Sequence, residues 1–333
     1  MIELTKHLAA FVGVFVATYA GTGLVLLLLM WLSLFDQPNE RSSHTTPIPR
    51  GGGLAVVPVV LGAWAWVGHF MSAATPVAFT VIWCALALAA ISWLEDWRGV
   101  PTIVRLLAQV AAVSVALFAM RDFGPFFGGF LSPNLDLFAV AVLWVWFINL
   151  YNFMDGIDGI TGVETACLGL GVALVAALAN LDGGFTMFGT TLAAAAFGFL
   201  WWNWQPARVF LGDVGSIPLG FLSGWLLLML ADQGQWAVAL ILPLYYLADA
   251  TITLLRRIAR RERFWRAHRQ HFYQQATQWR MRHRDATLWI LAANVVLIAL
   301  ALVAVKGWIW PALAGAFVAV AALLFHFGRR PAH

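Results

Sequence analysis

Residues 136–159 read DLFAVAVLWVWFINLYNFMDGIDG and combine the two features that decide the fold. The first part is apolar, and a helix that crosses a bilayer needs about 20 mostly apolar residues. The second part ends in four polar residues spaced three apart, Asn149, Asn152, Asp155 and Asp158. The glycines after both Asp disfavour an unbroken helix, so we expect the two Asn on the last helical turn and the two Asp on the following loop. The alternative is a polar turn stabilised by its own Asn and Asp side chains.

The composition of the whole chain indicates a membrane protein. Of its 333 residues, 62% are hydrophobic and only 11% are charged, and the mean hydropathy is +0.81. A water-soluble domain of this size would need a larger polar surface. We therefore predict an all-α fold, a polytopic integral membrane helical bundle that forms one transmembrane domain over residues 1–333.

Charge and cysteine usage exclude two other classes of protein. A net charge of +4 and a pI near 9.4 could suggest nucleic-acid binding, but a bias of basic residues toward cytoplasmic loops explains them better in a membrane protein. Cys84 and Cys167 lie in apolar segments, which predicts buried thiols and no disulfide framework. We expect no nucleic-acid partner.

We predict about eleven membrane-spanning helices from the apolar runs. Their approximate ranges are 8–35, 53–71, 77–94, 102–120, 136–153, 161–180, 186–203, 215–232, 236–255, 286–305 and 308–327. The first run is longer than the apolar core of a signal peptide, so we predict that it is a spanning helix.

The distribution of basic residues predicts the orientation. The connections on one face contain 17 of the 20 Lys and Arg residues, including ten Arg in a basic loop at 256–285. Because basic loops stay in the cytoplasm, this face is predicted to be cytoplasmic, with the N-terminus outside and the C-terminus inside.

Acidic residues lie at the ends of two apolar runs on the same face. Glu95 and Asp96 end the third run, where the helix dipole disfavours carboxylates, so we expect compensation by Arg98 and Arg105 or by a metal ion. A solvated loop is the alternative. Asp213 opens a later run within VFLGDVGS and suits either a helix N-cap or a ligand of a hard cation.

The basic loop has two interpretations. Its arginines suit phosphate groups through bidentate contacts, or they serve only orientation and attraction to anionic lipid. His268 and His271 could share one helix face, but they are a weak basis for a zinc site. Asp249, near the cytoplasmic end of its run, is a functional candidate with Arg256 or Arg257 as partner.

Taken together, these polar residues converge on one face of the bundle. A transporter usually places such groups near the middle of the bilayer, whereas an enzyme that works at the interface places them at one end. Carboxylates that hold Mg²⁺ and arginines that hold phosphate are the ingredients of phosphoryl transfer.

The same segments, in this order, resemble the polyprenyl-phosphate N-acetylhexosamine-1-phosphate transferases of glycosyltransferase family 4. RSSHTTPIPRGGG at 41–53 resembles their first cytoplasmic loop, and Glu95-Asp96 stands where the family has Asp-Asp. NLYNFMDGIDG is similar to the family motif N-x-x-N-x-x-D-G-x-D-G, and the segment from Asn203 to Asp213 is similar to the one that carries a metal-binding Asp. AHRQH at 267–271 resembles the His-containing loop, and looks most like the O-antigen-initiating bacterial branch.

The resemblance implies a reaction in the bacterial inner membrane. The sugar-1-phosphate of a UDP-N-acetylhexosamine would pass to undecaprenyl phosphate with release of UMP, which starts O-antigen or another cell-envelope polysaccharide. Mg²⁺, or Mn²⁺ in its place, would neutralise the pyrophosphate. The resemblance leaves open the sugar and whether the chain forms a homodimer.

The resemblance also implies roles for individual residues. The catalytic residues would be Glu95, Asp96 and Asp155, and it stays open which of the first two is the base. Asp213 and Asn152 would bind the metal, Asp158 would hydrogen-bond the uracil, and Phe210 would stack on it. The residues expected to bind substrate are His44, Arg50, Asn149, Asn152, Asp158, Asn203, Phe210, His268, Arg269 and His271.

A lipid-linked-sugar flippase or an ion-coupled transporter is the alternative function. The many spans and Asp249 would suit it, while the clustering of polar residues on one face argues against it. A phosphotransferase of the CDP-alcohol type is a further alternative, but its long Asp-rich motif is absent from the sequence.

Overall fold

The computed structural model describes residues 2–37, 46–71, 75–127, 129–262 and 268–329. The helices within these ranges are α1 (Ile2–Trp31), α2 (Gly53–Phe70), α3 (Thr75–Arg98), α4 (Thr102–Ala119), α5 (Pro133–Phe153), α6 (Ile160–Leu178), α7 (Gly183–Asn203), α8 (Asp213–Asp232), α9 (Trp236–Ile241), α10 (Leu244–Ala259), α11 (Phe272–Trp279), α12 (His283–Val305) and α13 (Ile309–Gly328). Two short antiparallel strands, β1 (Phe35–Asp36) and β2 (Ile48–Pro49), pair with Phe35 opposite Pro49.

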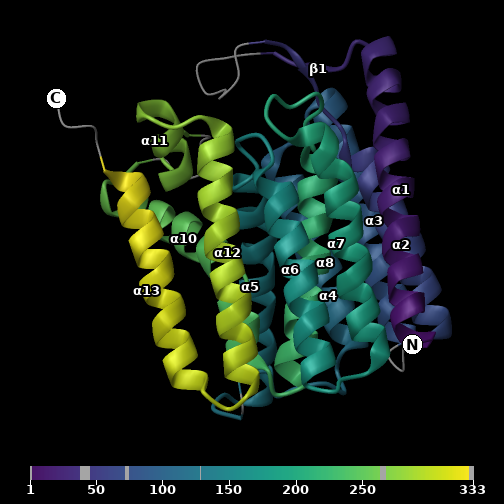
Figure 1. Cartoon of the computed structure of the whole chain (residues 1–333), viewed down its shortest axis with the longest axis vertical. Coiled ribbons are helices and arrows are strands. Elements are labelled where there is room, and N and C mark those ends of the chain that lie inside the picture. Colours follow the sequence, from purple (N-terminus) through teal and green to yellow (C-terminus); the bar gives the residue numbers. More distant parts are fainter. Residues whose placement is uncertain (1, 38–45, 72–74, 128, 263–267, 330–333) are drawn as a thin grey trace.

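The long helices stand side by side in one bundle, and the two chain ends lie at opposite ends of it (Figure 1). Ten helices in the described ranges are long and apolar enough to cross a membrane. This confirms the predicted polytopic all-α bundle. We call the end that carries β1 and α11, uppermost in Figure 1, the polar end.

The predicted crossing at 236–255 is not a single helix. The chain forms the short α9, breaks at Leu242 and Pro243, and continues as α10 to Ala259. Proline has no N–H and its ring disfavours the preceding helical turn, which explains the break. Ten described helices, rather than about eleven, therefore meet the criterion for a span, and the predicted range 236–255 is covered by two shorter helices.

The predicted basic loop at 256–285 also contains more helix than expected. α10 extends into it as far as Ala259, α11 lies inside it, and α12 begins at His283. Part of this loop therefore has a regular backbone that packs against α12 and α13 at the polar end.

The most enclosed helices are α6, α7 and α8, whereas only a third or fewer of the residues in the spanning parts of α1, α4, α12 and α13 are buried. α6 and α7 approach closely because Gly169 and Gly189 face each other. A Cβ atom at Gly169 would lie 2.6 Å from the carbonyl oxygen of Gly189, so a larger residue would separate the helices.

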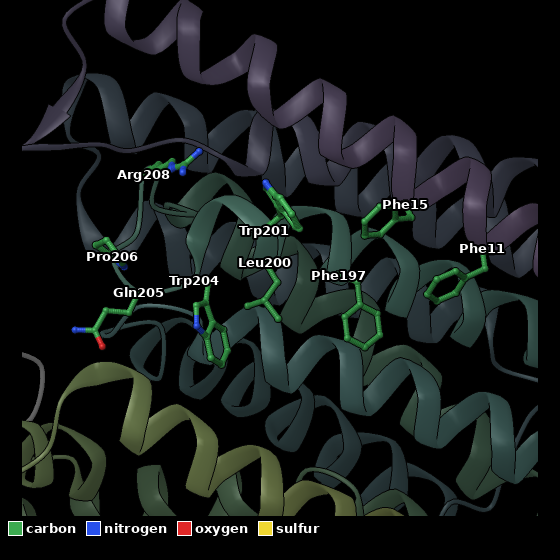
Figure 2. A pocket seen from close by; sticks show the side chains of 9 residues that line it. All are labelled: Phe11, Phe15, Phe197, Leu200, Trp201, Trp204, Gln205, Pro206 and Arg208. Carbon is green, nitrogen blue, oxygen red and sulfur yellow. The ribbon is translucent and has the colours of Figure 1, made fainter.

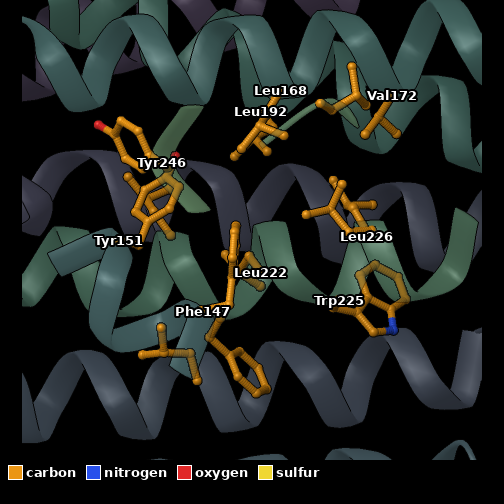
Figure 3. Close-up of a cluster of buried hydrophobic side chains, with 14 of the residues drawn as sticks. Phe147, Tyr151, Leu168, Val172, Leu192, Leu222, Trp225, Leu226 and Tyr246 are labelled. Carbon is orange, nitrogen blue, oxygen red and sulfur yellow. The ribbon is translucent and has the colours of Figure 1, made fainter. Parts of the chain in front are cut away.

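Large buried side chains from α5, α6, α7, α8 and α10 pack together inside the bundle (Figure 3). The rings of Trp144 and Phe221 stack at a centroid distance of 4.8 Å, and the indole N–H of Trp144 donates to the carbonyl of Phe221 at 3.0 Å. Tyr151 contacts the hydroxyl of Thr165 at 2.6 Å. These contacts anchor the C-terminal part of α5, which carries Asn152 and leads into the loop of Asp155.

Glycines bring α2 and α8 together at the polar end. The N–H groups of Gly51 and Gly52 donate to the carbonyl of Phe210 at 3.0 and 2.8 Å. A Cβ atom at Gly53 would clash with the backbone of Gly215. The segment after β2 thus packs directly on the loop that leads into α8, and this close approach requires glycine.

Candidate active site

Four charged side chains from distant parts of the sequence meet at the polar end. Arg50 Nη2 lies 2.6 Å from Asp213 Oδ1 and 3.0 Å from Asp96 Oδ1. Arg105, in the first turn of α4, places Nη1 2.9 Å from Asp213 Oδ2. Both carboxylate oxygens of Asp213 are therefore ion-paired. We call Arg50, Asp96, Arg105 and Asp213 the charged cluster.

The carboxylate of Asp96 satisfies the start of α8. It accepts the backbone N–H of Asp213 at 3.3 Å and that of Val214 at 3.0 Å. The first N–H groups of a helix have no partner within the helix, so an acceptor from another helix serves as its cap. Gly212 has a φ of +77°, and a Cβ atom there would lie 2.8 Å from Asp96 Oδ2. Glycine therefore permits this contact.

Glu95 is oriented differently from Asp96. Its carboxylate accepts the N–H of Val100 and lies 3.3 Å from Arg105 Nη1. Its side chain is 22% exposed, against 2% for Asp96. Arg105 is thus one expected counter-ion of the acidic pair, while Arg98 lies over the ring of Trp97. Glu95 occupies the outer edge of the cluster.

Asn152 and Asp155 approach the charged cluster from the end of α5. The amide of Asn152 donates to the hydroxyl of Ser216 at 2.8 Å, and Ser216 lies one helical turn after Asp213. The same charges affect the pKa of the half-buried Asp155. Burial, reinforced by Asp213 and Asp96, raises the pKa of Asp155 to about 6, although Thr161 and Arg50 act in the opposite direction.

The pKa of Arg50 reflects the same electrostatics. Burial alone would lower it, but Asp96, Asp213, Asp36 and Asp155 together raise the pKa of this guanidinium above its usual range. Arg50 therefore stays charged. It is the cation around which the acidic residues of this end are arranged.

Asp158 and Asn203 connect the loops around the cluster. Asn203 accepts the N–H of Gly159 at 2.9 Å and donates to the carbonyl of Val209 at 2.9 Å. Asp158 accepts the N–H of Ala207 at 3.1 Å and lies 3.1 Å from His283 Nδ1. Both side chains are buried. In this structure they hold the loops after α5 and α7 in place.

Two further predicted residues lie at the margin of this arrangement. Asn149 donates to Gln109 of α4 at 2.6 Å and to the carbonyl of Val145 at 2.8 Å. Phe210 forms a parallel bridge with Arg50 through its backbone. Phe210 is therefore joined to the charged cluster through the chain itself, whereas Asn149 faces α4.

The basic loop contributes a buried acid–histidine pair. His271 Nδ1 lies 3.1 Å from Asp249 Oδ1, and both side chains are buried. Asp249 also accepts the N–H groups of Phe272 and Tyr273 at 3.0 and 3.3 Å. The expected partners Arg256 and Arg257 are not the ones that contact it; Arg257 pairs instead with Glu262 at 3.0 Å. Asp249 therefore fixes the start of α11.

α11 connects this pair to the end of α5. The hydroxyl of Tyr273 donates to the carbonyl of Phe153 at 3.1 Å, and the rings of His271 and Tyr273 stack at 5.7 Å. A Cβ atom at Gly156 would clash with that hydroxyl. The ring of Tyr273 thus lies between His271 and the loop that contains Asp155. No motif in the sequence had indicated a role for Tyr273 at this site.

The remaining predicted residues of the loops are His268, Arg269 and His44. The ring of His268 lies 4.9 Å from that of His271. Arg269 lines a cavity between α10 and α11 that contains none of the charged cluster. His44 lies outside the described residues. Sequence reasoning did not select Ser216, although its position three residues after Asp213 places it on the same face of α8.

The oxygen donors of the polar end suit a hard cation. Carboxylate and amide oxygens are ligands that Mg²⁺ prefers, and Asp213 and Asn152 supply them. Among the described residues, no three His, Cys, Asp or Glu side chains form a ready metal site. Positive charge from Arg50 and Arg105 already lies against both oxygens of Asp213. A divalent cation thus fits the donor chemistry if it displaces these guanidinium groups.

Two apolar grooves open on the outside of the bundle. One, of about 750 Å³, lies between α1 and α7 and ends at Gln205, Pro206 and Arg208 (Figure 2). The other, of about 650 Å³, lies between α5, α8 and the α9–α10 break and includes Trp146 and Pro243. Both are lined mainly by aromatic and aliphatic side chains, which suit a hydrocarbon chain.

Residues 78–231 match the model of a family described as glycosyl transferase family 4. The matched segment contains Asp96, Arg105, Asp155 and Asp213. It begins after Arg50 and ends before His271.

The chain is similar to a probable undecaprenyl-phosphate N-acetylglucosaminyl 1-phosphate transferase of Bacillus subtilis, with 26% identity over 96% of this chain and 90% of that protein. It is 29% identical to a decaprenyl-phosphate N-acetylglucosaminephosphotransferase of Mycobacterium leprae over 62% of this chain and 57% of the relative. A phospho-N-acetylmuramoyl-pentapeptide-transferase of Picosynechococcus sp. is 32% identical over 52% of this chain and 50% of the relative. The chain thus spans between half and three-fifths of the length of the last two relatives.

Proposed function

We propose that the chain is a polyprenyl-phosphate N-acetylhexosamine-1-phosphate transferase whose donor is a UDP-N-acetylhexosamine and whose acceptor is undecaprenyl phosphate, because residues 78–231 match glycosyl transferase family 4 and the chain is similar to such transferases. In this reaction an acceptor phosphate oxygen attacks the phosphorus that carries the sugar. The bond from that phosphorus to the UMP oxygen breaks, and UMP leaves. The product is a lipid-linked sugar diphosphate.

The observation that carries this proposal is the charged cluster at the polar end. Arg50, in the segment between β2 and α2, and Arg105, in α4, point at the carboxylates of Asp96 and Asp213. Guanidinium groups bind phosphate oxygens as they bind carboxylates. A membrane-anchored acceptor and a water-soluble donor can meet only at one end of the bundle, and these groups lie there.

Asp155 is suited to move the proton of the acceptor. Its pKa is raised to about 6, and the second ionisation of a phosphate monoester also lies near pH 6. A base with a matched pKa transfers a proton efficiently near neutral pH. Asp96 is less suited because its oxygens already accept two backbone N–H groups. We therefore assign the base role to Asp155 and a positioning role to Asp96.

Asp213 and Asn152 are the residues that would hold Mg²⁺, with Mn²⁺ as the substitute. When bound, the ion would supply charge neutralisation at the pyrophosphate. Arg50 would hold a phosphate oxygen on one side of Asp213 and Arg105 on the other. His271, oriented by Asp249, would donate toward the donor from α11.

The donor base would lie near the loops after α5 and α7. Asp158 and Asn203 hold these loops through Ala207, Gly159 and Val209, and the ring of Phe210 would stack on the uracil. The apolar grooves would receive the prenyl chain. The arginine-rich polar end would face the cytoplasm of a bacterium, and the lipid product would start O-antigen or a related envelope polysaccharide.

A transporter is not favoured. Asp249, the acid that would suit a transporter, is paired with His271, and Glu164 Oε2 accepts from Asn294 at 2.7 Å, although Glu164 Oε1 has no partner. The relative that is similar over 96% of this chain is named as a transferase.

UMP release tests the proposal. Purified protein in detergent should release UMP only when undecaprenyl phosphate, Mg²⁺ and one member of a panel of UDP-N-acetylhexosamines are all present. The same panel identifies the sugar. Failure to release UMP with every sugar would reject the proposal, and sugar flux into proteoliposomes without UMP release would support the transporter.

A further inference from the structure

The two apolar grooves of the bundle lie at different depths. The groove between α5, α8 and the α9–α10 break includes Phe126 and Trp236, near the chain connections at the end opposite the charged cluster. The groove between α1 and α7 ends instead at Arg208, in the loop that leads to Asp213 (Figure 2). A single prenyl chain needs one groove, which leaves the α1–α7 groove available to another lipid.

Aromatic side chains from both helices form the walls of the α1–α7 groove. Phe11 and Phe15 of α1 and Phe197 and Trp201 of α7 line it (Figure 2). The rings of Phe11 and Phe197 meet at a centroid distance of 6.1 Å, and Tyr19 of α1 contacts Trp201 edge-on at 5.8 Å. These ring contacts join α1 to α7, so the groove is a defined apolar feature of their junction.

The groove covers the part of the bilayer nearest the polar end. Along α7 its lining extends from Phe197 to Trp204, a rise of roughly 10 Å. The hydrocarbon core of a bilayer is about 30 Å thick, so the groove lies within the leaflet on the side of the polar end. Trp201 is 64% exposed, and tryptophan is typical of the boundary between acyl chains and water. The groove thus matches the depth of an acyl chain of a lipid in this leaflet.

Arg208 provides a positive charge at the polar end of the groove. Its guanidinium lies 5.6 Å from the centre of the Trp202 ring, and its backbone N–H donates to the carbonyl of Trp202 at 2.8 Å. The indole N–H of Trp202 in turn donates to the carbonyl of Tyr19 in α1 at 2.9 Å. Arg208 is therefore held at the junction of α1 and α7, and as an exposed residue that lines the groove it presents its charge there.

Gln205 adds a hydrogen-bond donor at the same place. Its side-chain oxygen accepts the backbone N–H of Arg284 at 2.6 Å, which leaves its amide nitrogen as the donor. No acidic residue lines the groove within the described part of the chain. A guanidinium and an amide donor at the end of an apolar groove are complementary to a lipid with an anionic phosphate headgroup.

We propose that the α1–α7 groove binds one acyl chain of an anionic phospholipid, whose phosphate is held by Arg208 and Gln205. Trp201 and Trp204 would border the glycerol region of this lipid. Undecaprenyl phosphate shares the chemistry of a long chain with an anionic head, but a groove of roughly 10 Å suits a chain confined to one leaflet. The inference does not depend on the proposed transferase reaction.

Native mass spectrometry of the full-length protein in detergent tests the site. Delipidated protein is mixed with equal amounts of phosphatidylglycerol and phosphatidylcholine of the same chain length, and we expect the wild type to retain phosphatidylglycerol in preference. Arg208→Gln should reduce this preference about tenfold, because charge-assisted contacts to phosphate are the strong ones. Trp201→Ala should weaken the retention of both lipids, because it removes an apolar wall and leaves Arg208 in place.

Two matched variants serve as controls. Arg329→Gln removes another arginine of the polar end, whose guanidinium also lies over a ring, that of Phe325. Trp83→Ala removes a tryptophan of α3 that is 67% exposed. Neither Arg329 nor Trp83 lines the groove, so both variants should retain lipid as the wild type does.

Equal retention in Arg208→Gln and Arg329→Gln, or in Trp201→Ala and Trp83→Ala, would overturn the proposal. A further arm adds undecaprenyl phosphate in an amount equal to that of phosphatidylglycerol. We expect phosphatidylglycerol to stay bound. Its displacement would assign the groove to the acceptor and overturn the phospholipid.

Discussion

Asp96 caps the first turn of α8 by accepting the backbone N–H of Asp213 at 3.3 Å. The same carboxylate contacts Arg50, which in turn contacts the side chain of Asp213. Asp96 therefore holds in position both the backbone N–H of Asp213 and Arg50, the counter-ion of the Asp213 side chain. A residue that resembles one member of a catalytic acid pair acts here by positioning another acid.

Asp96→Asn should reduce the rate of UMP release by about 10²-fold or more, because removing a positioned acid–base or orienting group has effects of that size. The new amide would also present a donor to the N–H groups of α8. Glu95→Gln should have a smaller effect, since Glu95 lies at the exposed edge. Steady-state kinetics of both variants, with Glu95→Asp as a test of arm length, check this. Equal losses in Glu95→Gln and Asp96→Asn would contradict the assigned roles.

Asp213→Ala should abolish turnover, and EDTA should do the same to the wild type if Asp213 holds Mg²⁺. Asp213→Asn is the matched variant, because it keeps the shape while removing the charge. A thermal melt in detergent separates loss of chemistry from loss of fold. Full activity in EDTA would reject the metal, and an active Asp213→Ala variant would reject Asp213 as its ligand.

Asp249→Asn should destabilise the protein by about 1–3 kcal/mol, because the amide keeps only one acceptor oxygen and the donors at the other oxygen would be left unsatisfied. The groups that contact the carboxylate are His271, the N–H groups of Phe272 and Tyr273, and the hydroxyls of Tyr245 and Thr253. His271→Ala should lower kcat with a smaller change in thermal midpoint. Measuring both quantities for both variants distinguishes a catalytic ring from a structural one. An unchanged kcat in His271→Ala would remove the ring from the proposed site.

Acid should destabilise the basic loop through His268. Burial, followed by the charges of His271 and Arg257, lowers the pKa of His268 from 6.5 to about 4, although Glu262 and Asp249 act in the opposite direction. Below about pH 6.5 His268 becomes protonated in the unfolded chain but stays neutral in the folded chain. The contribution of neutral His268 to folding stability is therefore lost as the pH falls from 6.5 to 4. His268→Gln should reduce the fall in thermal midpoint over that range. An identical fall in the variant and the wild type would contradict the mechanism.

Gly53→Ala should destabilise the protein by roughly 1–3 kcal/mol, as overpacking does, and should impair activity. Its Cβ atom would clash with the backbone of Gly215 and displace the start of α8. Gly62→Ala on the same helix is the control, because its Cβ atom would meet nothing within 4 Å and alanine favours a helix. If both variants melted at the wild-type temperature, the contact between α2 and α8 would not be rigid.

The sequence alone determined the helices and the end of the bundle that carries the chemistry. A bilayer offers no partner to backbone N–H and C=O groups, so a long apolar run such as 136–153 must satisfy them internally as a helix. The observed α5 covers Pro133–Phe153. The motifs at 149–159 and 203–213 are each one continuous segment. Their resemblance to polyprenyl-phosphate transferases could therefore be recognised in the sequence without knowledge of the fold. Pro243 can be read in the sequence, but the apolar run at 236–255 is long enough for one span, so we predicted no break there.

Only the tertiary structure decided the partners. Arg50 and Asp213 are 163 residues apart, and Asp249 and His271 are 22 apart, so no local pattern relates them. Helical spacing suggested Arg256 or Arg257 for Asp249, but the packing of α11 supplies a histidine and two backbone N–H groups. Arg269 belongs to the motif of the basic loop, yet it lines a different cavity. Long-range pairs depend on how helices pack through glycines such as Gly53 and Gly215, and this geometry arises only when the whole bundle is assembled.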